Sequence, residues 1–469
     1  MARRNRKKVF EKVEVVDTAN RGKAVAKTGD GQVIFLNHAV PGDVVDIETY
    51  KKRRSFYEGR VTKYHRFSEK RTEPKCEHFG ICGGCKWQNM SYDAQLEFKQ
   101  KEVENNLKRI GQVDIPEILQ IIPSPDIFYY RNKMEFSFSD NRWLSTEELN
   151  SSVQFENKNG LGFHIPGKWD KVLDINKCWL QADPSNSIRN AVKDFANANK
   201  LSFFDLREQN GFLRTLMIRT SSSGEIMVLI QFYEDHADMR ERLLDHLQHR
   251  FPEITSLLYV INTKANDTLY DQNVVCYHGR DYILENMEGL SFKINAKSFY
   301  QTNSKQALEL YKVAREFAAL SGTELVYDLY TGTGTIAQFV SKQAHHVVGI
   351  ESVPDAIEAA KENAQLNAIN NVSFFVGDMK NMLNEDFINA NGKPDVVITD
   401  PPRDGMHKDV VKQLLKIAPN RIVYVSCNSA TQARDLALMS AKYDVKKVQP
   451  VDMFPHTHHV ENVVLLEKR

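Results

Sequence analysis

The sequence predicts an α/β protein in which a C-terminal domain with a doubly wound parallel sheet follows an N-terminal β-barrel and a central α+β domain. Two patterns carry this prediction. From about residue 291 onwards, short apolar runs alternate with helical stretches, which is typical of a parallel sheet covered by helices. Between residues 9 and 66, strand-like runs alternate with turn signals, as in a small barrel of the oligonucleotide-binding type. The apolar runs of the C-terminal sheet are LVYDL, HVVGI, VSFFV, DVVIT and IVYVS.

Length and composition are those of a globular protein of 469 residues, long enough for about three domains. We divide it into a barrel (1–68), a central domain (69–290) and a C-terminal domain (291–469), and we expect the helix at 91–110 to pack on the C-terminal domain. No run approaches the roughly 20 apolar residues of a membrane span, and no apolar signal core follows the basic N-terminus. Six cysteines without regular pairing argue against a secreted disulfide scaffold. We therefore expect a cytoplasmic protein and a monomer, although no sequence feature determines the oligomeric state.

Positive charge is concentrated in the N-terminal part of the chain. The whole chain carries a net charge of +1, whereas residues 1–75 contain 19 Lys and Arg against 10 Asp and Glu. The densest basic run, Lys51–Arg54, is flanked by Tyr50, Phe56 and Tyr57. Basic side chains interleaved with aromatic rings suit a polyanion whose bases can stack. The alternative is a solvated basic face.

A glycine-rich loop follows the first strand of the predicted C-terminal sheet. The segment DLYTGTGT (328–335) turns from that strand into a helix, and its glycines let the backbone approach a bound nucleotide closely. A dinucleotide-binding fingerprint would require a third glycine in place of Ala337. Glu351 ends the second strand, where a carboxylate can accept hydrogen bonds from both ribose hydroxyls, and Asp378 follows the third strand, where it can meet an adenine edge. The pattern resembles the Rossmann-like methyltransferases that use S-adenosyl-L-methionine (AdoMet), and the alternative is an ordinary turn.

Cys427 ends the fifth predicted strand, at the edge of the sheet where ligands bind. Its neighbours Ser426 and Asn428 are polar, which distinguishes the position from a core position. Asp400 follows the fourth strand and shares the same edge. A free cysteine is more often a small buried apolar residue, and that is the alternative interpretation. A thiol beside a cofactor loop indicates covalent catalysis.

Methylation of a pyrimidine is a reaction that needs such a thiol. Carbon C5 of uracil is a poor nucleophile until C6 is saturated, and a thiolate that adds to C6 creates an enolate that can take a methyl group from AdoMet. A base must next remove the C5 proton so that the thiol can be eliminated, and Glu461 is the candidate. A free thiol has a pKa of about 8.5 and is mostly protonated at neutral pH. Which group deprotonates it cannot be read from the sequence.

The segments TDPPRDG, VYVSCN and HTHHVEN together resemble the RNA uracil-5-methyltransferase family, whose products are 5-methyluridines in RNA. SFYQTNSKQ and YRNKMEF match further family segments, so the likeness covers essentially the whole chain. The resemblance implies that Cys427 is the nucleophile and Glu461 the proton acceptor. We interpret the histidines of HTHHVEN as loop residues rather than metal ligands. The residues implied around AdoMet or the reacting uracil are Gln301, Tyr330, Glu351 and Asp400.

Four other cysteines suggest a metal site. CEHFGICGGC supplies three thiols on one glycine-rich loop, and NKCWL supplies a fourth far downstream. Four thiolates can bind zinc or a 4Fe–4S cluster, although the paired C-x2-C spacing of a zinc ribbon is missing, and reduced core cysteines are a third interpretation. Family members with this barrel hold a 4Fe–4S cluster on matching cysteines, so the resemblance implies the cluster here, in an architectural role. The ligands would be Cys76, Cys82, Cys85 and Cys178.

The resemblance also indicates an RNA partner. It implies that the barrel is a TRAM domain, an RNA-binding module, and the target uridine should be flipped out because C6 is not accessible inside a helix. Arg131 and Lys133 are expected to help hold the displaced strand. Relatives that act on tRNA often lack the barrel and the cysteine cluster, which favours 23S rRNA as the substrate. The alternatives are a tRNA T-loop methyltransferase and a non-catalytic RNA-binding or assembly protein on a methyltransferase scaffold.

Overall fold

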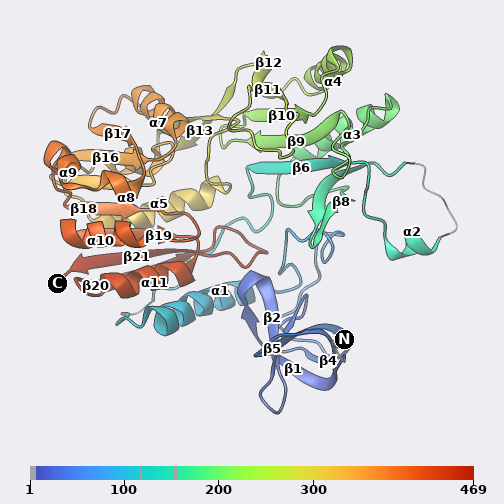
Figure 1. Cartoon of the computed structure of the whole chain (residues 1–469), viewed down its shortest axis with the longest axis horizontal. Helices are drawn as coiled ribbons and strands as arrows, with labels where there is room; N and C mark the ends of the chain where they lie inside the picture. Colours follow the sequence, from blue (N-terminus) through green and yellow to red (C-terminus); the bar gives the residue numbers. More distant parts are fainter. Residues whose placement is uncertain (1–6, 117, 152–156) are drawn as a thin grey trace.

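The structure, a computed structural model, describes residues 7–116, 118–151 and 157–469. Residues 1–6 of the expected barrel unit lie outside the described residues. A closed N-terminal barrel and an α/β C-terminal domain confirm the predicted fold class, and Figure 1 shows the central sheet beside them as a third body. Within the described ranges, every helix is too short or too polar to span a lipid bilayer.

The N-terminal barrel is a closed sheet in the strand order β1-β2-β3-β5-β4. Its core comes from the inward side of each strand, where alternate residues such as Val15, Ala26 and Ile34 are buried. The sequence pattern does not predict the short strand β2, because KAVAK places only alanines on the inward side. The strands are β1 (Val9–Ala19), β2 (Lys23–Lys27), β3 (Val33–Leu36), β4 (Val44–Lys52) and β5 (Phe56–Arg66).

The central domain is a seven-stranded sheet in the order β12-β11-β10-β9-β6-β7-β8. Its middle strands are buried on both faces: Val228 packs with the helices of this domain, whereas Met227 joins the core shared with the C-terminal domain. In a strand that is buried on both faces, apolar and polar residues do not alternate. This explains why the sequence of the central domain shows no clear strand pattern. The elements are β6 (Lys133–Ser139), α2 (Thr146–Asn150), β7 (Gly160–Ile165), β8 (Lys168–Asp174), α3 (Ser185–Ala198), β9 (Leu213–Thr220), β10 (Ile226–Phe232), α4 (Ala237–Arg250), β11 (Ile254–Ile261) and β12 (Val275–Gly279).

Two segments connect the three bodies. Helix α1 (Tyr92–Asn106) follows the barrel and lies against α11 (Ser429–Met439) of the C-terminal domain (Figure 1). It continues into a π-helical turn, Leu107–Gly111. The hairpin of β13 (Tyr282–Met287) and β14 (Leu290–Asn295) leads from the central sheet to the C-terminal domain. The expected domain boundary at residue 290 falls inside this hairpin.

The C-terminal sheet has the order β17-β16-β15-β18-β19-β21-β20. The five predicted apolar runs form the parallel strands β15 to β19. The sheet differs from a fully parallel one at its end, because β21 runs antiparallel to both β19 and β20. Helices α5, α6 and α7 cover one face, and α1, α10 and α11 cover the other. The elements are α5 (Ser304–Ala318), β15 (Leu325–Leu329), α6 (Thr335–Ser341), β16 (His346–Glu351), α7 (Pro354–Leu366), β17 (Val372–Val376), α8 (Met379–Met382), α9 (Glu385–Asn391), β18 (Val396–Thr399), α10 (Lys408–Ile417), β19 (Arg421–Ser426), α11 (Ser429–Met439), β20 (Tyr443–Val451) and β21 (Glu461–Lys468).

Candidate active site

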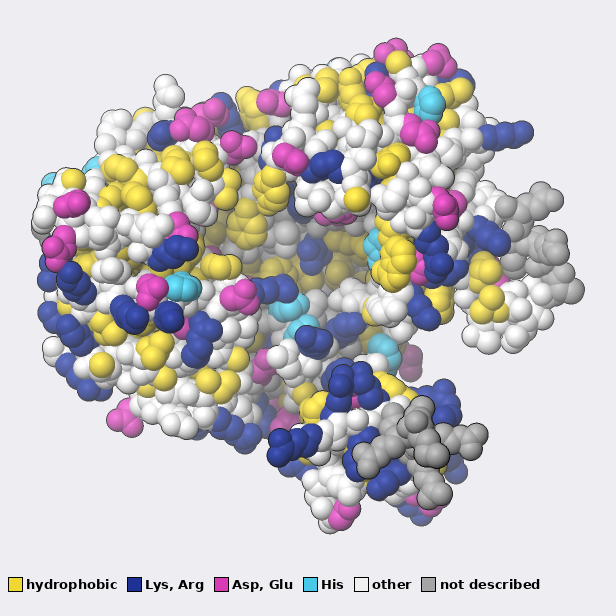
Figure 2. Space-filling view, in the orientation of Figure 1, with side chains coloured by type: hydrophobic (Ala, Val, Ile, Leu, Met, Phe, Trp, Pro, Cys, Tyr) yellow, Lys and Arg dark blue, Asp and Glu magenta, His cyan; other side chains and the backbone are white. Residues whose placement is uncertain are grey.

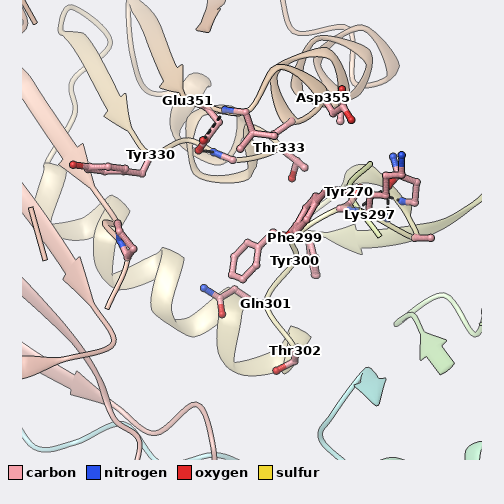
Figure 3. Close-up of a pocket in the computed structure, with 18 of the residues that line it drawn as sticks. Tyr270, Lys297, Phe299, Tyr300, Gln301, Thr302, Tyr330, Thr333, Glu351 and Asp355 are labelled. Carbon is pink, nitrogen blue, oxygen red and sulfur yellow. Dashed lines mark hydrogen bonds between the residues drawn. The ribbon is translucent and has the colours of Figure 1, made fainter. Parts of the chain in front are cut away.

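A cavity of about 1040 Å³ opens at the carboxyl ends of the parallel strands, between the C-terminal and central domains. Strand order reverses at β15, which pairs with β16 on one side and β18 on the other, and open α/β sheets bind ligands at such a point. Figure 2 shows the molecule hollowed between its domains, and Figure 3 shows side chains that enter the cavity from both sides. The predicted site residues that line it are Gln301, Tyr330, Glu351, Asp400, Cys427 and Glu461.

Strand register places three of these side chains in one row. The last paired residues of β15 lie beside those of β16 and β18, so Tyr330, Glu351 and Asp400 occupy adjacent positions along the sheet edge. Tyr330 has a left-handed backbone, with φ of 62°, which turns the chain out of the sheet. Burial raises the pKa of Asp400 to about 7. This carboxyl therefore titrates near neutral pH.

The glycine loop is shaped by a buried carboxyl that the sequence pattern marks only as the end of a strand. Oδ2 of Asp328 accepts hydrogen bonds from Thr331 Oγ1 at 2.5 Å and from the Ala337 amide at 3.0 Å. Burial raises the pKa of Asp328 to about 7. Gly334 has φ of 75°, and a Cβ at this position would lie 2.8 Å from the Phe374 ring. The loop therefore needs glycine at 334 and a hydrogen-bond acceptor at 328.

Glu351 is fixed beside this loop by backbone donors. Its Oε1 accepts hydrogen bonds from the amides of Ser352 at 2.7 Å and Val353 at 3.1 Å, and its Oε2 accepts one from Gly332 at 3.3 Å. Gln301 comes from the segment before α5 on another wall, and its amide enters the same cavity (Figure 3). A ligand between these walls would meet a fixed carboxylate on one side and an amide on another.

Asp378 is the predicted cofactor residue that the structure does not bring into the cavity. Its Oδ1 accepts a hydrogen bond from the Lys380 amide at 3.1 Å, and its carboxylate pairs with the Lys380 ammonium at 3.1 Å. These contacts cap helix α8, because the first amides of a helix need acceptors. Asp378 remains close enough to Tyr330 to raise the pKa of that phenol together with burial.

Antiparallel pairing of β19 with β21 brings the thiol and a carboxyl together. Ser426 pairs with Asn462, so one residue further along the register Cys427 faces Glu461, and facing residues have Cβ atoms about 4.5–5.5 Å apart. Burial, with the charges of Glu461 and Asp400, raises the pKa of Cys427 to about 11. Burial and the charge of Asp400 raise the pKa of Glu461 to about 8. Both groups therefore hold their protons more tightly than a solvent-exposed cysteine and glutamate do.

Arg403 opposes these shifts. Burial raises the pKa of Cys427, and the guanidinium of Arg403 lowers it through its charge and a hydrogen bond; the same charge lowers the pKa of Glu461. Arg403 lies in the loop after β18, exposed to solvent, and lines the cavity with both groups. No sequence signal marks this role, because an arginine in a polar loop cannot be told from an ordinary surface charge.

The four cysteines predicted as metal ligands are free thiols that lie near one another. Burial raises the pKa of Cys82 to about 11 and that of Cys85 to about 12, and the charges of Cys178 and Cys76 contribute to both shifts. Gln88 Oε1 accepts a hydrogen bond from the Cys76 amide, and Gln88 Nε2 donates one to Cys85 Sγ, both at 3.1 Å. Among the described residues, no group of three or more His, Cys, Asp or Glu side chains could hold a metal ion. The metal site therefore stays a prediction.

Of the three histidines before β21, His458 and His459 line a cavity together with Cys427. Burial lowers the pKa of His456 to about 4, that of His458 to about 3 and that of His459 to about 4. The rings of His458 and His459 pack with centroids 4.1 Å apart. All three are neutral at physiological pH.

Comparison with known proteins shows which family this chain is similar to. Residues 219–469 match the model of the tRNA (uracil-5-)-methyltransferase family. A protein of Bacteroides thetaiotaomicron, named as an uncharacterized RNA methyltransferase, is 58% identical over 454 residues, which cover 96% of this chain and 100% of that protein. One of the same name from Porphyromonas gingivalis is 55% identical over 461 residues, covering 97% and 99%. The structure of the Pyrococcus abyssi tRNA (uracil-54, C5)-methyltransferase with S-adenosyl-L-homocysteine is 28% identical with a TM-score of 0.75, covering 97% of this chain and 100% of that chain.

Proposed function

Because the chain belongs to the tRNA (uracil-5-)-methyltransferase family and is an AdoMet-dependent RNA methyltransferase, we propose that it methylates C5 of a uridine through a covalent adduct between Cys427 and C6. The observation that carries the proposal is the pairing of β19 with β21, which sets Cys427 against Glu461 in the cavity that also contains the glycine loop. A thiol, a base and a methyl-donor site within reach of one ring are what C5 methylation requires.

In the proposed reaction the Cys427 thiol first loses its proton to solvent. The thiolate then adds to C6 of uracil, and the electron pair of the C5–C6 double bond moves towards O4. C5 then attacks the methyl group of AdoMet, and the sulfur of AdoMet keeps the electron pair of the broken bond. The carboxylate of Glu461 takes the C5 proton, the C5–C6 double bond re-forms, and the C6–S bond breaks to release the thiolate. Arg403 stabilises the thiolate at both ends of this cycle.

The environment of Glu461 suits it to the task of base. Burial and the charge of Asp400 raise its pKa to about 8, so its carboxylate binds a proton more tightly than an ordinary glutamate does. General bases work best when their pKa lies near the operating pH. The positive charge of Arg403 lowers the pKa of Glu461 and so favours its deprotonation before each turnover.

For AdoMet, we propose that the carboxylate of Glu351 accepts hydrogen bonds from the ribose hydroxyls. Gln301, Tyr330 and Asp400 would contact AdoMet or the reacting uracil, since all three line the cavity around the glycine loop. Asp378 would reach the adenine edge only after its side chain leaves the start of α8. The S-adenosyl-L-homocysteine bound by the Pyrococcus relative supports the class of cofactor.

For the RNA, we propose a uridine of 23S rRNA, recognised with the help of a TRAM-type barrel. This preference rests on the combination of the barrel and the cysteine-rich loop. A tRNA substrate is the second candidate, favoured by the Pyrococcus relative, which is named as a tRNA enzyme and aligns with 97% of this chain. The barrel alone therefore does not distinguish rRNA from tRNA.

The test is transfer of labelled methyl from AdoMet to unmodified 23S rRNA and unmodified tRNA in parallel, followed by nucleoside mapping. We expect 5-methyluridine in 23S rRNA. Cys427→Ala should abolish transfer while AdoMet binding is retained. Methyl on tRNA alone would keep the mechanism and replace the substrate. Transfer to neither RNA, or normal turnover by Cys427→Ala, would contradict the proposed reaction.

We further propose that Cys76, Cys82, Cys85 and Cys178 hold a 4Fe–4S cluster that cross-links the two segments carrying them. The chemistry of the donor set fits, because four thiols gather without forming disulfides and the Gln88 amide donates to one sulfur. A cluster of four irons needs its thiolates further apart than a single ion does. The test is the iron and sulfide content of anaerobically purified protein: Cys82→Ser should lose both, and Cys276→Ser should keep both. Iron-free wild-type protein would refute the cluster.

A further inference from the structure

A second cavity, of about 500 Å³, lies on the other side of Cys427. It is formed by three parts of the chain: the end of β1 with the turn after it, the C-terminal half of α1, and the C-terminal domain around the start of α11. The two cavities share Arg403, Cys427 and His459. The thiol therefore stands at their common wall, and a base bonded to it lies between them.

Contacts between domains fix the walls of this second cavity. The Lys101 ammonium pairs with the Asp17 carboxylate at 2.9 Å, which joins α1 to the barrel. The Asn106 amide donates a hydrogen bond to Ser429 Oγ at 2.9 Å, which joins α1 to α11. All four residues line the cavity. The second cavity is thus part of the assembled fold, built where three segments are tied together.

Three other polar side chains that face the second cavity have no hydrogen-bond or ion-pair partner among the described residues. The side-chain amides of Asn20 and Asn105 make no hydrogen bond there, and the guanidinium of Arg21 makes no ion pair. Arg21 lies exposed with a left-handed backbone, φ 64°. An amide donates and accepts at once, as the edge of a base does, whereas a guanidinium matches a phosphate. Together they offer the groups that recognise a nucleotide.

Charge decides which part of a nucleotide would enter. Inside the second cavity the Lys101 ammonium is already paired with the Asp17 carboxylate, and the Glu102 carboxyl lies beside it, so the described side chains of this part offer no free cation to a phosphate. Arg21 and Arg403 are exposed to solvent and can meet the sugar–phosphate backbone at the opening. The base would therefore lie inside and the backbone outside.

We propose that the second cavity binds the base of a nucleotide next to the target uridine, held out of its helix and contacted by Asn20 and Asn105, with Arg21 on the adjoining phosphate. This inference rests on the proposed function. A neighbour of a uridine bonded to Cys427 is one phosphodiester link away, and the second cavity begins at that thiol. The enzyme would then recognise sequence beside its target, in addition to the RNA contacts proposed for the barrel.

The test measures kcat/KM for methyl transfer to a short stem-loop containing the uridine mapped by the experiment above. The RNA is made with its natural neighbours or with an abasic nucleotide on one side or the other. For the wild-type enzyme, loss of one neighbouring base should lower kcat/KM by roughly tenfold, since base contacts are typically of this size. Asn105→Ala should lower kcat/KM on intact RNA by a similar factor. For this variant, kcat/KM on the abasic RNA should equal that on intact RNA.

Arg21→Ala should also weaken transfer to intact RNA, whereas Arg109→Ala is the matched control. Arg109 is an exposed arginine in the π-helical turn after α1; it does not line the second cavity and makes no ion pair with other described residues. The subsite would be overturned if an abasic neighbour lowered kcat/KM equally for the wild type and for Asn105→Ala, or if an abasic nucleotide on neither side lowered kcat/KM. Either result would leave the proposed function intact. Absence of transfer by the wild type to any RNA would instead overturn the proposed function.

Discussion

Replacing Arg403 with Gln removes the positive charge beside Cys427 and keeps a side chain that can donate a hydrogen bond. Burial and nearby carboxylates raise the pKa of this thiol to about 11, and the guanidinium opposes them. A hydrogen bond to a charged group stabilises that group by about 1.5–3 kcal/mol. Because Arg403 is exposed to solvent, we expect it to stabilise the Cys427 thiolate by no more than the lower of these two values. About 1.4 kcal/mol corresponds to one pKa unit. Arg403→Gln should therefore raise the Cys427 pKa by about one unit and lower the thiolate fraction about tenfold below that pKa.

The assay is alkylation of Cys427 by iodoacetamide over a range of alkaline pH, followed by mass spectrometry of its peptide. Only the thiolate reacts, so the rate rises with pH, and the Arg403→Gln curve should be displaced to higher pH. Arg403→Lys keeps the charge and should displace it less. Exposed Cys276 in the same protein serves as an internal reference whose curve should not move. Superimposable Cys427 curves for the wild type and Arg403→Gln would refute the reasoning.

Further predictions concern the base, a buried ion pair and the glycine loop. Glu461→Gln should permit methylation but block removal of the C5 proton, so that labelled protein–RNA adduct accumulates on denaturing gels while free product falls by about 10²–10⁴-fold; loss of product without adduct would contradict the assignment. Lys99→Met leaves the fully buried carboxylate of Asp452 without its cation and should lower the free energy of unfolding in urea by about 3–5 kcal/mol, and an unchanged midpoint would contradict this. Gly334→Ala should melt at a lower temperature than Gly332→Ala, because both glycines have positive φ but only a Cβ at 334 would meet other atoms within 4 Å; the reverse order would refute the packing argument.

Sequence patterns predict a strand well where an apolar run is bounded by helical stretches on both sides. The parallel strands of the C-terminal sheet are apolar runs bounded by helices, and all five were predictable. Strand β2 was not, since Ala24 and Ala26 bury little surface and have low strand propensity. In the central sheet, Met227 and Val228 serve two different cores, which removes the alternation on which a strand prediction depends.

The candidate site was predictable as a set of motifs but not as a geometry. Cys427 and Glu461 are separated in sequence, and only the antiparallel return of β21 brings them face to face. A parallel sheet, as predicted, would not have done so at this edge. Asp378 occupies the expected place after its strand, but the start of α8 competes for its carboxylate. Arg403 lowers the pKa of Cys427 because it lies close to the thiol in the folded chain. This proximity cannot be seen in the sequence.

The position of Glu461 depends on segments far from the C-terminal domain. The loop between β20 and β21 precedes Glu461, and Lys99 contacts the first residues of this loop. The Lys99 ammonium donates hydrogen bonds to the Asp452 carboxylate at 2.6 Å and to the Phe454 carbonyl at 3.0 Å. Tyr130 of the central domain donates a hydrogen bond to the Pro455 carbonyl at 3.0 Å. These contacts come from α1 and from the segment before β6, so the N-terminal half holds the loop that carries the proposed base.

The cysteine-rich loop binds the same segment. The amides of Lys86 and Trp87 donate hydrogen bonds to the His456 carbonyl at 2.8 and 3.0 Å, and Gln95 Oε1 accepts one from the His456 amide at 2.7 Å. Cys85 directly precedes Lys86, so any group that orders the four cysteines also orders the backbone that holds His456. An architectural cluster would then contribute to catalysis without electron transfer, by keeping Glu461 opposite Cys427.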